Sequence, residues 1–285
     1  MLFLCVLFAA GGGGIAGYQI AVSRAPGPVG PVASLDEASA LCDRGPTVVG
    51  DLEIVGSDSV GEALACVKEV TGNLIISERS GLIALSLPGL HTVGGSVEVS
   101  TPALTRLSLP ALKSVGRDLT IYPNRLLESL DLTALTTVGG AFTIEGNPVL
   151  EDALLPSLTE AESFVLDSNL RLRATTLPSL VRVRGFFDIE ANPALESLTL
   201  PSLDEVIGDF EIRENLSLTR VEAPVLREVG GPVWVGTNLA LTTVLLPSLE
   251  TIGGRVRTEE LPALQRFVCP GAHSFGGSQD TTTNE

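Results

Sequence analysis

The chain has 285 residues, of which 44% are hydrophobic and only 4% aromatic, so any core must be built mainly from aliphatic side chains. Its formal net charge of −16 argues against nucleic acid or an anionic membrane surface as a partner. Acidic surfaces also keep copies of a protein apart, so a monomer is expected.

The first 25 residues form an apolar N-terminal segment. Residues 2–22 are almost continuously uncharged, and Arg24, Pro26 and Pro28 end the run. This length fits an export signal, and it could also span a bilayer as a retained anchor. Basic residues that usually precede an export signal are missing, so both alternatives stay open. Either one predicts a secreted or cell-surface protein, and a retained segment would tether the chain to a membrane.

Residues 26–45 are expected to form a linker and an N-terminal cap. Ser34, Asp36 and Glu37 precede the small apolar run 38–41, a pattern that predicts a short amphipathic helix over 33–41. Ser34 is the candidate N-cap, because its hydroxyl oxygen can accept a hydrogen bond from a backbone N–H of the first turn.

From residue 46 to residue 270 the sequence repeats with a period of about 23 residues. One copy reads GFFDIEANPALESLTLPSLDEVIG (185–208), and the next reads GDFEIRENLSLTRVEAPVLREVG (208–230). A column of prolines marks the repeat: Pro88, Pro110, Pro156, Pro178, Pro201, Pro224 and Pro247. A column of glycines runs parallel to it: Gly50, Gly72, Gly94, Gly116, Gly139, Gly185, Gly208, Gly230 and Gly253.

Each copy is expected to form one coil of an all-β, right-handed parallel β-solenoid of about nine or ten coils. After the glycine, alternating apolar residues such as Phe210 and Ile212 indicate a strand with one buried face. A second apolar run ends at the proline, which cannot donate a ladder hydrogen bond and therefore belongs at a corner. Stacked coils would lie about 4.8 Å apart, so equivalent residues would form continuous rows.

Two apolar columns are predicted to fill the interior. The first contains Leu52, Leu74, Val97, Leu119, Phe142, Phe164, Phe187, Phe210, Val233 and Val256. The second contains Ile54, Ile76, Val99, Ile121, Ile144, Leu166, Ile189, Ile212 and Val235.

A column of asparagines follows the second apolar column. Its members are Asn124, Asn147, Asn169, Asn192, Asn215 and Asn238. They could form a polar binding stripe, but a structural ladder is favoured, with the amides capping backbone groups that face inward at the turns.

The full pattern resembles a known family. Gly-x-Leu-x-Ile, then Asn, then Leu-x-x-Leu-x-Leu-Pro-x-Leu-x-x-Val-Gly, over about residues 46–270, is similar to the receptor L-domain. That leucine-rich-repeat-like β-helix occurs in insulin-receptor and epidermal-growth-factor-receptor ectodomains, and fungal cell-wall surface proteins carry related repeats. The segment 47–54, preceded by Cys42, is similar to the first coil of the family. The resemblance implies a ligand-binding or cell-surface role without catalysis. Growth-factor binding is not implied, because the chain has neither a cysteine-rich module nor a kinase region.

The four cysteines fall at different places in the predicted solenoid. Cys42 and Cys66 lie about one coil apart and are candidates for a disulfide that seals the N-terminal end. Cys269 takes the place of a buried leucine and is expected to be a buried thiol, with pairing to another chain as the alternative. Cys5 lies in the N-terminal segment. After the last coil, the polar tail 271–285 is expected to be disordered.

The sequence shows no convincing catalytic, metal or cofactor site. With His91 and His273 as the only histidines, a metal triad or a Ser-His-Asp arrangement is not credible. Asp188 and Glu211 are one coil apart and could bring their carboxyl groups to about 5 Å, as in retaining glycosidases. A solvated acidic face is favoured over such an enzyme and over a weak calcium site.

The outward face of the first strand is the candidate ligand surface. Trp234, the only tryptophan, lies between Val233 and Val235, so alternation places it outside. An aromatic side chain beside carboxylates and arginines is typical of a binding hot spot. The alternative is that Trp234 packs under the tail or in a dimer contact. The candidate residues are Tyr122, Phe186, Asp188, Glu211, Arg213, Trp234, Arg255 and Arg257.

The sequence therefore predicts a recognition module that binds a protein or a glycan along this face, without enzymatic activity. The alternatives are a passive spacer of the cell envelope and, less favoured, a carbohydrate-active enzyme.

Overall fold

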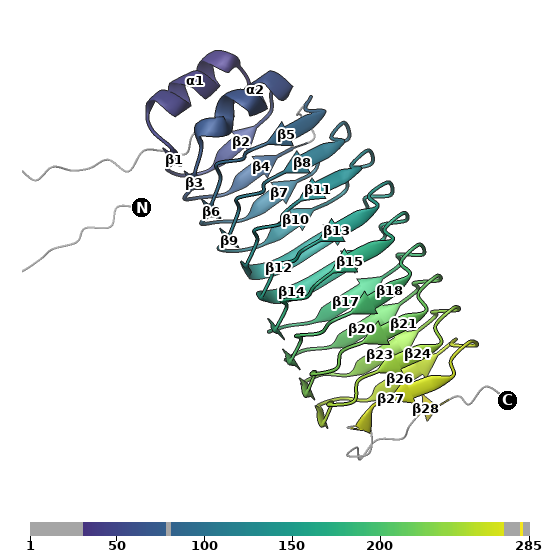
Figure 1. Cartoon of the computed structure of the whole chain (residues 1–285). Coiled ribbons are helices and arrows are strands. Elements are labelled where there is room, and N and C mark those ends of the chain that lie inside the picture. Colours follow the sequence, from purple (N-terminus) through teal and green to yellow (C-terminus); the bar gives the residue numbers. More distant parts are fainter. Residues whose placement is uncertain (1–30, 78–80, 271–279, 282–285) are drawn as a thin grey trace, which may run out of the picture.

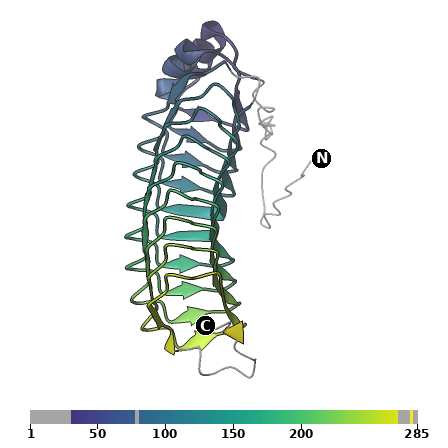
Figure 2. The same cartoon turned by 90° about the vertical axis from the view of Figure 1, so that its right-hand side faces the viewer.

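The structure is a computed structural model that describes residues 31–77, 81–270 and 280–281. It is a gently curved stack of parallel β-coils with two short helices at its N-terminal end (Figures 1 and 2). The inner coils contribute short strands to three faces, which we number in the order in which the chain reaches them after the glycine column; in the first coil α2 (Asp58–Ala63) stands in place of the second-face strand. The predicted all-β parallel solenoid with a short helical cap is confirmed.

The first face carries the strand that follows the glycine column. It holds β2 (Leu52–Ile54), β4 (Leu74–Ile76), β7 (Val97–Val99), β10 (Leu119–Ile121), β12 (Thr137–Glu145), β14 (Glu160–Asp167), β17 (Phe187–Glu190), β20 (Phe210–Arg213), β23 (Val233–Gly236) and β26 (Val256–Glu259).

The second face carries the strand before each proline corner. It holds β5 (Ala84–Ser86), β8 (Arg106–Ser108), β11 (Ser129–Asp131), β13 (Asp152–Leu154), β15 (Ala174–Thr176), β18 (Ser197–Thr199), β21 (Arg220–Glu222), β24 (Thr243–Leu245) and β27 (Arg266–Val268).

The third face carries two-residue strands that lead back to the glycine column. It holds β1 (Thr47–Val48), β3 (Glu69–Val70), β6 (Thr92–Val93), β9 (Ser114–Val115), β16 (Arg182–Val183), β19 (Glu205–Val206), β22 (Glu228–Val229) and β25 (Thr251–Ile252). In two coils β12 and β14 turn the corner and serve both the third and the first face.

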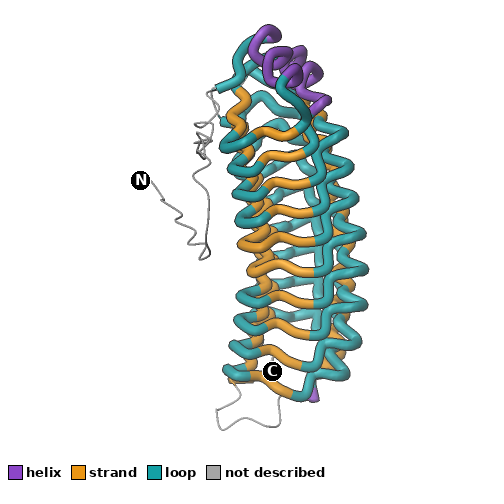
Figure 3. Tube along the Cα trace, turned by 90° about the vertical axis from the view of Figure 1, so that its left-hand side faces the viewer, coloured by secondary structure: helices purple, strands orange, loops and turns teal. Residues whose placement is uncertain are grey.

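The register of the first face follows the predicted columns. Phe187 pairs with Phe164 on one side and with Phe210 on the other, and every strand pair on this face is parallel. Phe142, Phe164, Phe187 and Phe210 are fully buried and stack with ring centroids 5.1 to 5.2 Å apart. Successive coils therefore lie directly over one another, as the columns of strands in Figure 3 show.

The glycine column allows successive coils to approach each other closely. A Cβ added at Gly116 or Gly253 would clash with the carbonyl oxygen of the equivalent glycine one coil earlier. Neither glycine has a positive φ, so the absence of a side chain is what this corner requires.

The asparagine column is the predicted structural ladder. All six asparagines are fully buried. The Oδ1 atom of Asn192 accepts a hydrogen bond from the backbone N–H of Asn169 at 3.1 Å, and its Nδ2 donates to the carbonyl oxygens of Leu166 and Glu190 at 2.9 and 2.8 Å. The ladder extends one coil further than predicted, because the N–H of buried Thr101 donates to Asn124 Oδ1.

A column of left-handed residues precedes the ladder. Ser168, Ala191, Glu214, Thr237 and Glu260 have φ between 50° and 58°, and Gly146 has φ 64° in the same column. A non-glycine residue in this region costs about 1–2 kcal/mol. Where an asparagine follows, as after Ala191 and Glu214, its hydrogen bonds offset this cost, because the amide fixes the corner; Glu260 is followed by Leu261 instead.

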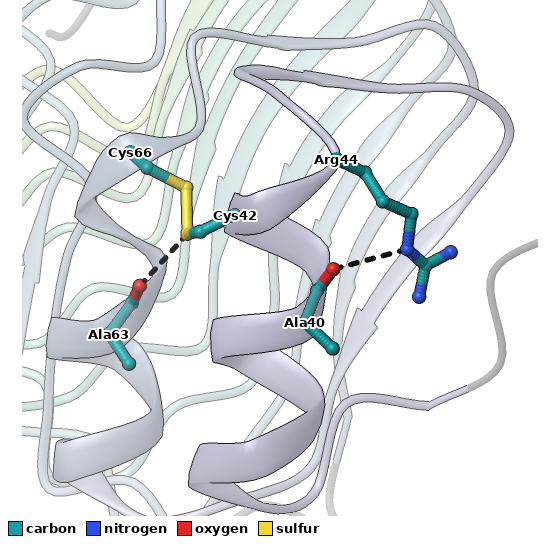
Figure 4. Close-up of a disulfide and its surroundings, with 5 residues drawn as sticks. All are labelled: Ala40, Cys42, Arg44, Ala63 and Cys66. Carbon is teal, nitrogen blue, oxygen red and sulfur yellow. Dashed lines mark hydrogen bonds between the residues drawn. A yellow bond between two sulfur atoms is a disulfide. The ribbon is translucent and has the colours of Figure 1, made fainter.

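The N-terminal cap consists of α1 (Leu35–Asp43), α2 (Asp58–Ala63) and the 3₁₀ turn η1 (Leu64–Cys66). Ser34 caps α1 as predicted, and Glu37 returns a hydrogen bond to form a capping box. The predicted disulfide between Cys42 and Cys66 is present and ties α1 to η1 (Figure 4). Sequence analysis did not predict α2.

No α-helix lies at the C-terminal end among the described residues. Cys269 is buried at 8% exposure, in place of a leucine as predicted. Asp280–Thr281, within the tail expected to be disordered, forms β28 and pairs with β26.

Several predictions fall on residues that the structure does not describe. These are the N-terminal segment 1–25 with Cys5, the start of the linker, and His273 with the rest of the tail. Among the described residues, no helix has both the length and the apolar character needed to cross a bilayer.

Candidate functional site

The candidate site lies on the outward side of the first face, over β17, β20, β23 and β26. Inward residues of these strands are held by the core, so the alternate residues must point outward. In register, Asp188 neighbours Glu211, Glu211 neighbours Trp234, and Trp234 neighbours Arg257. The structure thus brings four of the predicted site residues into one row.

Arg213 lies beside this row and holds two carboxylates. Its Nη2 is 2.7 Å from Glu190 Oε2 and 3.0 Å from Glu211 Oε2. About a fifth of each of these side chains is exposed, so the pairs are partly shielded from solvent. The Nε atom of Arg213 is buried and has no hydrogen-bond partner among the described residues.

Trp234 is clamped between two arginines. The guanidinium carbons of Arg213 and Arg257 lie 4.2 and 4.7 Å from the ring centroid, within the range of cation–π contacts. Gly236 makes room for the ring, because a Cβ there would lie 2.9 Å from Trp234 Nε1. The prediction that Trp234 points outward is confirmed by the register, but the residue is half-buried and not fully exposed to solvent.

Asp188 is the most strongly perturbed acid of the row. Its pKa is raised to about 7, first by burial and then by the neighbouring carboxylates Glu190 and Glu211. Its Oδ1 atom is buried and receives no hydrogen bond from the described residues. Burial also raises the pKa of Glu190. The site therefore combines crowded carboxylates with polar atoms that lack partners.

A hollow of about 270 Å³ opens between the coils of β17 and β20. Phe186, half of whose ring is exposed, forms one wall, while Asp188, Asp209 and Glu211 contribute carboxylates. We call this feature the acidic hollow, lined by Gly185, Phe186, Asp188, Gly208, Asp209 and Glu211.

Two predicted site residues lie apart from this cluster. Tyr122 is exposed at the end of β10, three coils before β17. Arg255 is exposed just before β26, and nothing in the structure joins its side chain to the cluster. The predicted surface is therefore shorter than proposed from the sequence, and it centres on β17 to β26.

The sequence left two other chemistries to consider on this face: a weak calcium site and a glycosidase-like pair of carboxyl groups. Among the described residues, no group of three or more His, Cys, Asp or Glu side chains is arranged to hold a metal ion. Glu211, the partner of Asp188 in the proposed glycosidase pair, is engaged by Arg213. His91 is exposed on the third-face side of its coil.

A second, more polar groove of about 330 Å³ lies along the third face. Its charges already pair with one another: Arg182 with Glu205 at 2.6 Å, and Arg227 with Asp204 at 2.5 Å. Internal pairing leaves fewer groups for a ligand, so this groove is a weaker candidate.

Sequence reasoning missed Asp209 and Gly236. Gly236 occupies a column that holds Glu190 and Arg213 in the two preceding coils, and this loss of a side chain next to the only tryptophan was a readable signal. Asp209 also belongs to a column whose members could have been compared coil by coil.

No protein-family model matches the chain, and no curated protein or solved structure matches it either. The parallel solenoid is compatible with an L-domain-like fold. A relation to that family rests on the repeat pattern alone.

Proposed function

We propose that the chain is a recognition module of the cell surface or extracellular space, which binds a protein or glycan ligand through the first face around Trp234. The observation that carries the proposal is the clamped indole: the only tryptophan lies between Arg213 and Arg257, beside an acidic hollow. Tryptophan and arginine are the residues most enriched in binding hot spots.

The scaffold supports this role because it holds the site rigidly. The four strands under the cluster are bonded to one another in continuous register, and their inward side chains are buried, except that Val256 and Thr258 of β26 are only partly buried. A rigid surface loses little conformational entropy on binding. The resemblance to receptor L-domains favours the same non-catalytic role.

The location part of the proposal has one structural support. The Cys42–Cys66 disulfide is typical of oxidising compartments such as the cell exterior. Together with the apolar segment 2–22 of the sequence, it favours an exported or surface-tethered protein.

The test is binding of the full chain to arrays of glycans and of peptides, compared with Trp234→Ala. Because the indole anchors the cluster, we expect the variant to bind its array ligand at least about tenfold more weakly. Tyr122→Ala is the control, since it removes an exposed aromatic side chain five coils before Trp234 and is expected to leave binding unchanged. If the wild type and Trp234→Ala bind equally well, the ligand does not bind at Trp234. If the wild type binds nothing on either array, the passive-spacer alternative is favoured.

A carbohydrate-cleaving enzyme, which the sequence favours less than the passive spacer, has one observation on its side. The raised pKa of Asp188, about 7, beside Glu211 resembles the general acid of a glycosidase. Turnover of aryl glycosides by the wild type, lost in Asp188→Asn, would replace the binding proposal. We expect no turnover.

A further inference from the structure

The acidic hollow has the size and charge of a receptor for one cationic side chain. Three of its six lining residues are acidic and none is basic. Its volume of about 270 Å³ lies just below the range of about 300–1,000 Å³ typical of pockets for drug-sized ligands. A single long side chain therefore fits better than an oligosaccharide or a cofactor.

Asp209 occupies a column that elsewhere stabilises the backbone. Asp51, Asn73 and Asp118 hold the equivalent position, and in each case Oδ1 accepts a hydrogen bond from the backbone N–H of the next coil, at 2.7, 2.8 and 2.9 Å. In each coil the oxygen lies against the glycine that precedes this N–H: Gly72, Gly95 and Gly140.

The Asp209 side chain takes the same position, but no backbone N–H is available there to donate to its carboxylate. Its Oδ1 lies against Gly231 as Asp118 Oδ1 lies against Gly140. The residue after Gly231 is Pro232, which has no backbone N–H. Pro232 therefore removes the hydrogen bond that the Asp209 carboxylate would otherwise accept, and Asp209 is one of the residues that line the hollow.

Two further features of the hollow favour a cationic ligand that donates hydrogen bonds. The Oδ1 atom of Asp188 is buried without a hydrogen-bond donor among the described residues, a costly arrangement that a bound donor would relieve. Phe186 is 46% exposed and offers an aromatic side chain on which a planar cation can stack.

We infer that the acidic hollow binds the guanidinium group of an arginine presented by a protein partner. A guanidinium carries several donors in one plane, so it can bond to two carboxylates while it stacks on Phe186. The net charge of −16 would draw such a basic partner towards the chain. The inference rests on the proposed function, because it supplies the partner's anchor beside Trp234 on the same face.

The experiment titrates the full chain with acetyl-Gly-Arg-Gly-amide and follows backbone amide NMR signals of residues 185–188 and 208–211. One anchoring side chain should bind with a Kd of about 1 mM. The peptide with citrulline in place of arginine keeps the shape without the charge, and we expect it to bind at least about tenfold more weakly, since charge-assisted hydrogen bonds are lost.

Three variants separate the role of Asp209 from charge in general. Asp209→Asn should weaken binding about tenfold. Pro232→Ala removes no charge but gives Asp209 the backbone donor that Ala141 gives Asp118, so it should weaken binding by about threefold or more. Asp118→Asn removes a charge from the same column while keeping an oxygen that accepts the Ala141 N–H, and it should bind like the wild type.

Equal affinity for the arginine and citrulline peptides, or wild-type binding by Asp209→Asn, would overturn the inference. A neutral glycan from the array that shifts the same NMR signals would also overturn it. The array result for Trp234→Ala is separate: if Trp234→Ala loses its array ligand while Asp209→Asn keeps it, the proposed function stands and the arginine site fails.

Discussion

At the scale of single residues, Asp188 makes the free energy of unfolding of the solenoid depend on pH. Its pKa is raised to about 7, mainly by burial and also by the neighbouring carboxylates Glu190, Glu211 and Asp167, while Arg213 opposes the shift. The unfolded chain releases the same proton near pH 4. Between about pH 4 and pH 7 the folded protein therefore holds more protons than the unfolded chain, so the free energy of unfolding falls as the pH rises through this range.

Asp188→Asn should remove this loss of stability. We expect the variant to gain about 1–2 kcal/mol over the wild type between pH 4 and pH 8, a figure reduced for the screening of a partly exposed group. Urea unfolding at pH 4, 5.5, 7 and 8 measures the difference. Glu98→Gln removes an exposed carboxylate from the same outward column and should give a curve parallel to that of the wild type. If the stability of Asp188→Asn followed the same pH dependence as the wild type, the raised pKa of Asp188 would be contradicted.

At the scale of elements, the asparagine ladder replaces the hydrogen bonds that a corner cannot make for itself. Each amide joins the coil before it and the coil after it, as Asn192 does with Asn169 and Asn215. Because these groups are fully buried, water cannot replace a lost partner.

Asn192→Ala should therefore be strongly destabilising. It leaves the buried Asn169 N–H without its partner and removes the hydrogen bonds from Asn192 Nδ2 to the carbonyl oxygens of Leu166 and Glu190. At about 1–3 kcal/mol for an unpaired buried group and about 1 kcal/mol for each lost hydrogen bond, we expect a loss of about 3 kcal/mol or more. Thermal unfolding, with hydrogen exchange at the Asn169 amide, is the measurement. Leu170→Ala, next to the ladder and 54% exposed, is the control and should cost less than about 1 kcal/mol. Similar losses in the two variants would show that the ladder contributes little.

The elements that were predictable from sequence are those fixed by local pattern. Alternation placed Phe187 and Ile189 inside, the repeat placed Asn192 at a buried corner, and Ser34 marked the start of α1. Each of these follows from its own coil or from an immediate neighbour in the sequence.

The elements that were missed depend on contacts between coils or on a break in the repeat. The helix α2 has only six residues and no side-chain cap, so it carried little signal. The burial of Trp234 depends on Arg213 and Arg257 in adjacent coils and on the absence of a side chain at Gly236. The part that Asp209 plays in the hollow depends on Pro232, one coil later, which alternation within a strand cannot reveal.

At the scale of the whole molecule, the stack behaves as a one-dimensional array. Each coil contacts the coil on either side through register-matched strands, and the two ends differ. At the N-terminal end lie α1, α2 and the disulfide, while at the other end β28 pairs with β26, the last long strand of the first face. In such an array, stability is approximately the sum of coil terms and nearest-neighbour interfaces. A coil remote from the ends and from the site should therefore be removable without loss of the fold.

Deletion of residues 97–118 tests this property. The cut joins Ser96 to Leu119, and because Ser96 and Asp118 are equivalent positions, every later residue keeps its column. We expect a folded rod shorter by about 5 Å, measured by small-angle X-ray scattering, with a β-type circular dichroism spectrum and arginine-peptide binding like that of the full chain. Deletion of residues 97–107 is the control, since it joins Ser96 to Ser108 and moves the following residues to the wrong face. If the two deletions unfold the protein alike, the coils are not independent units, and the fold depends on contacts that reach beyond nearest neighbours.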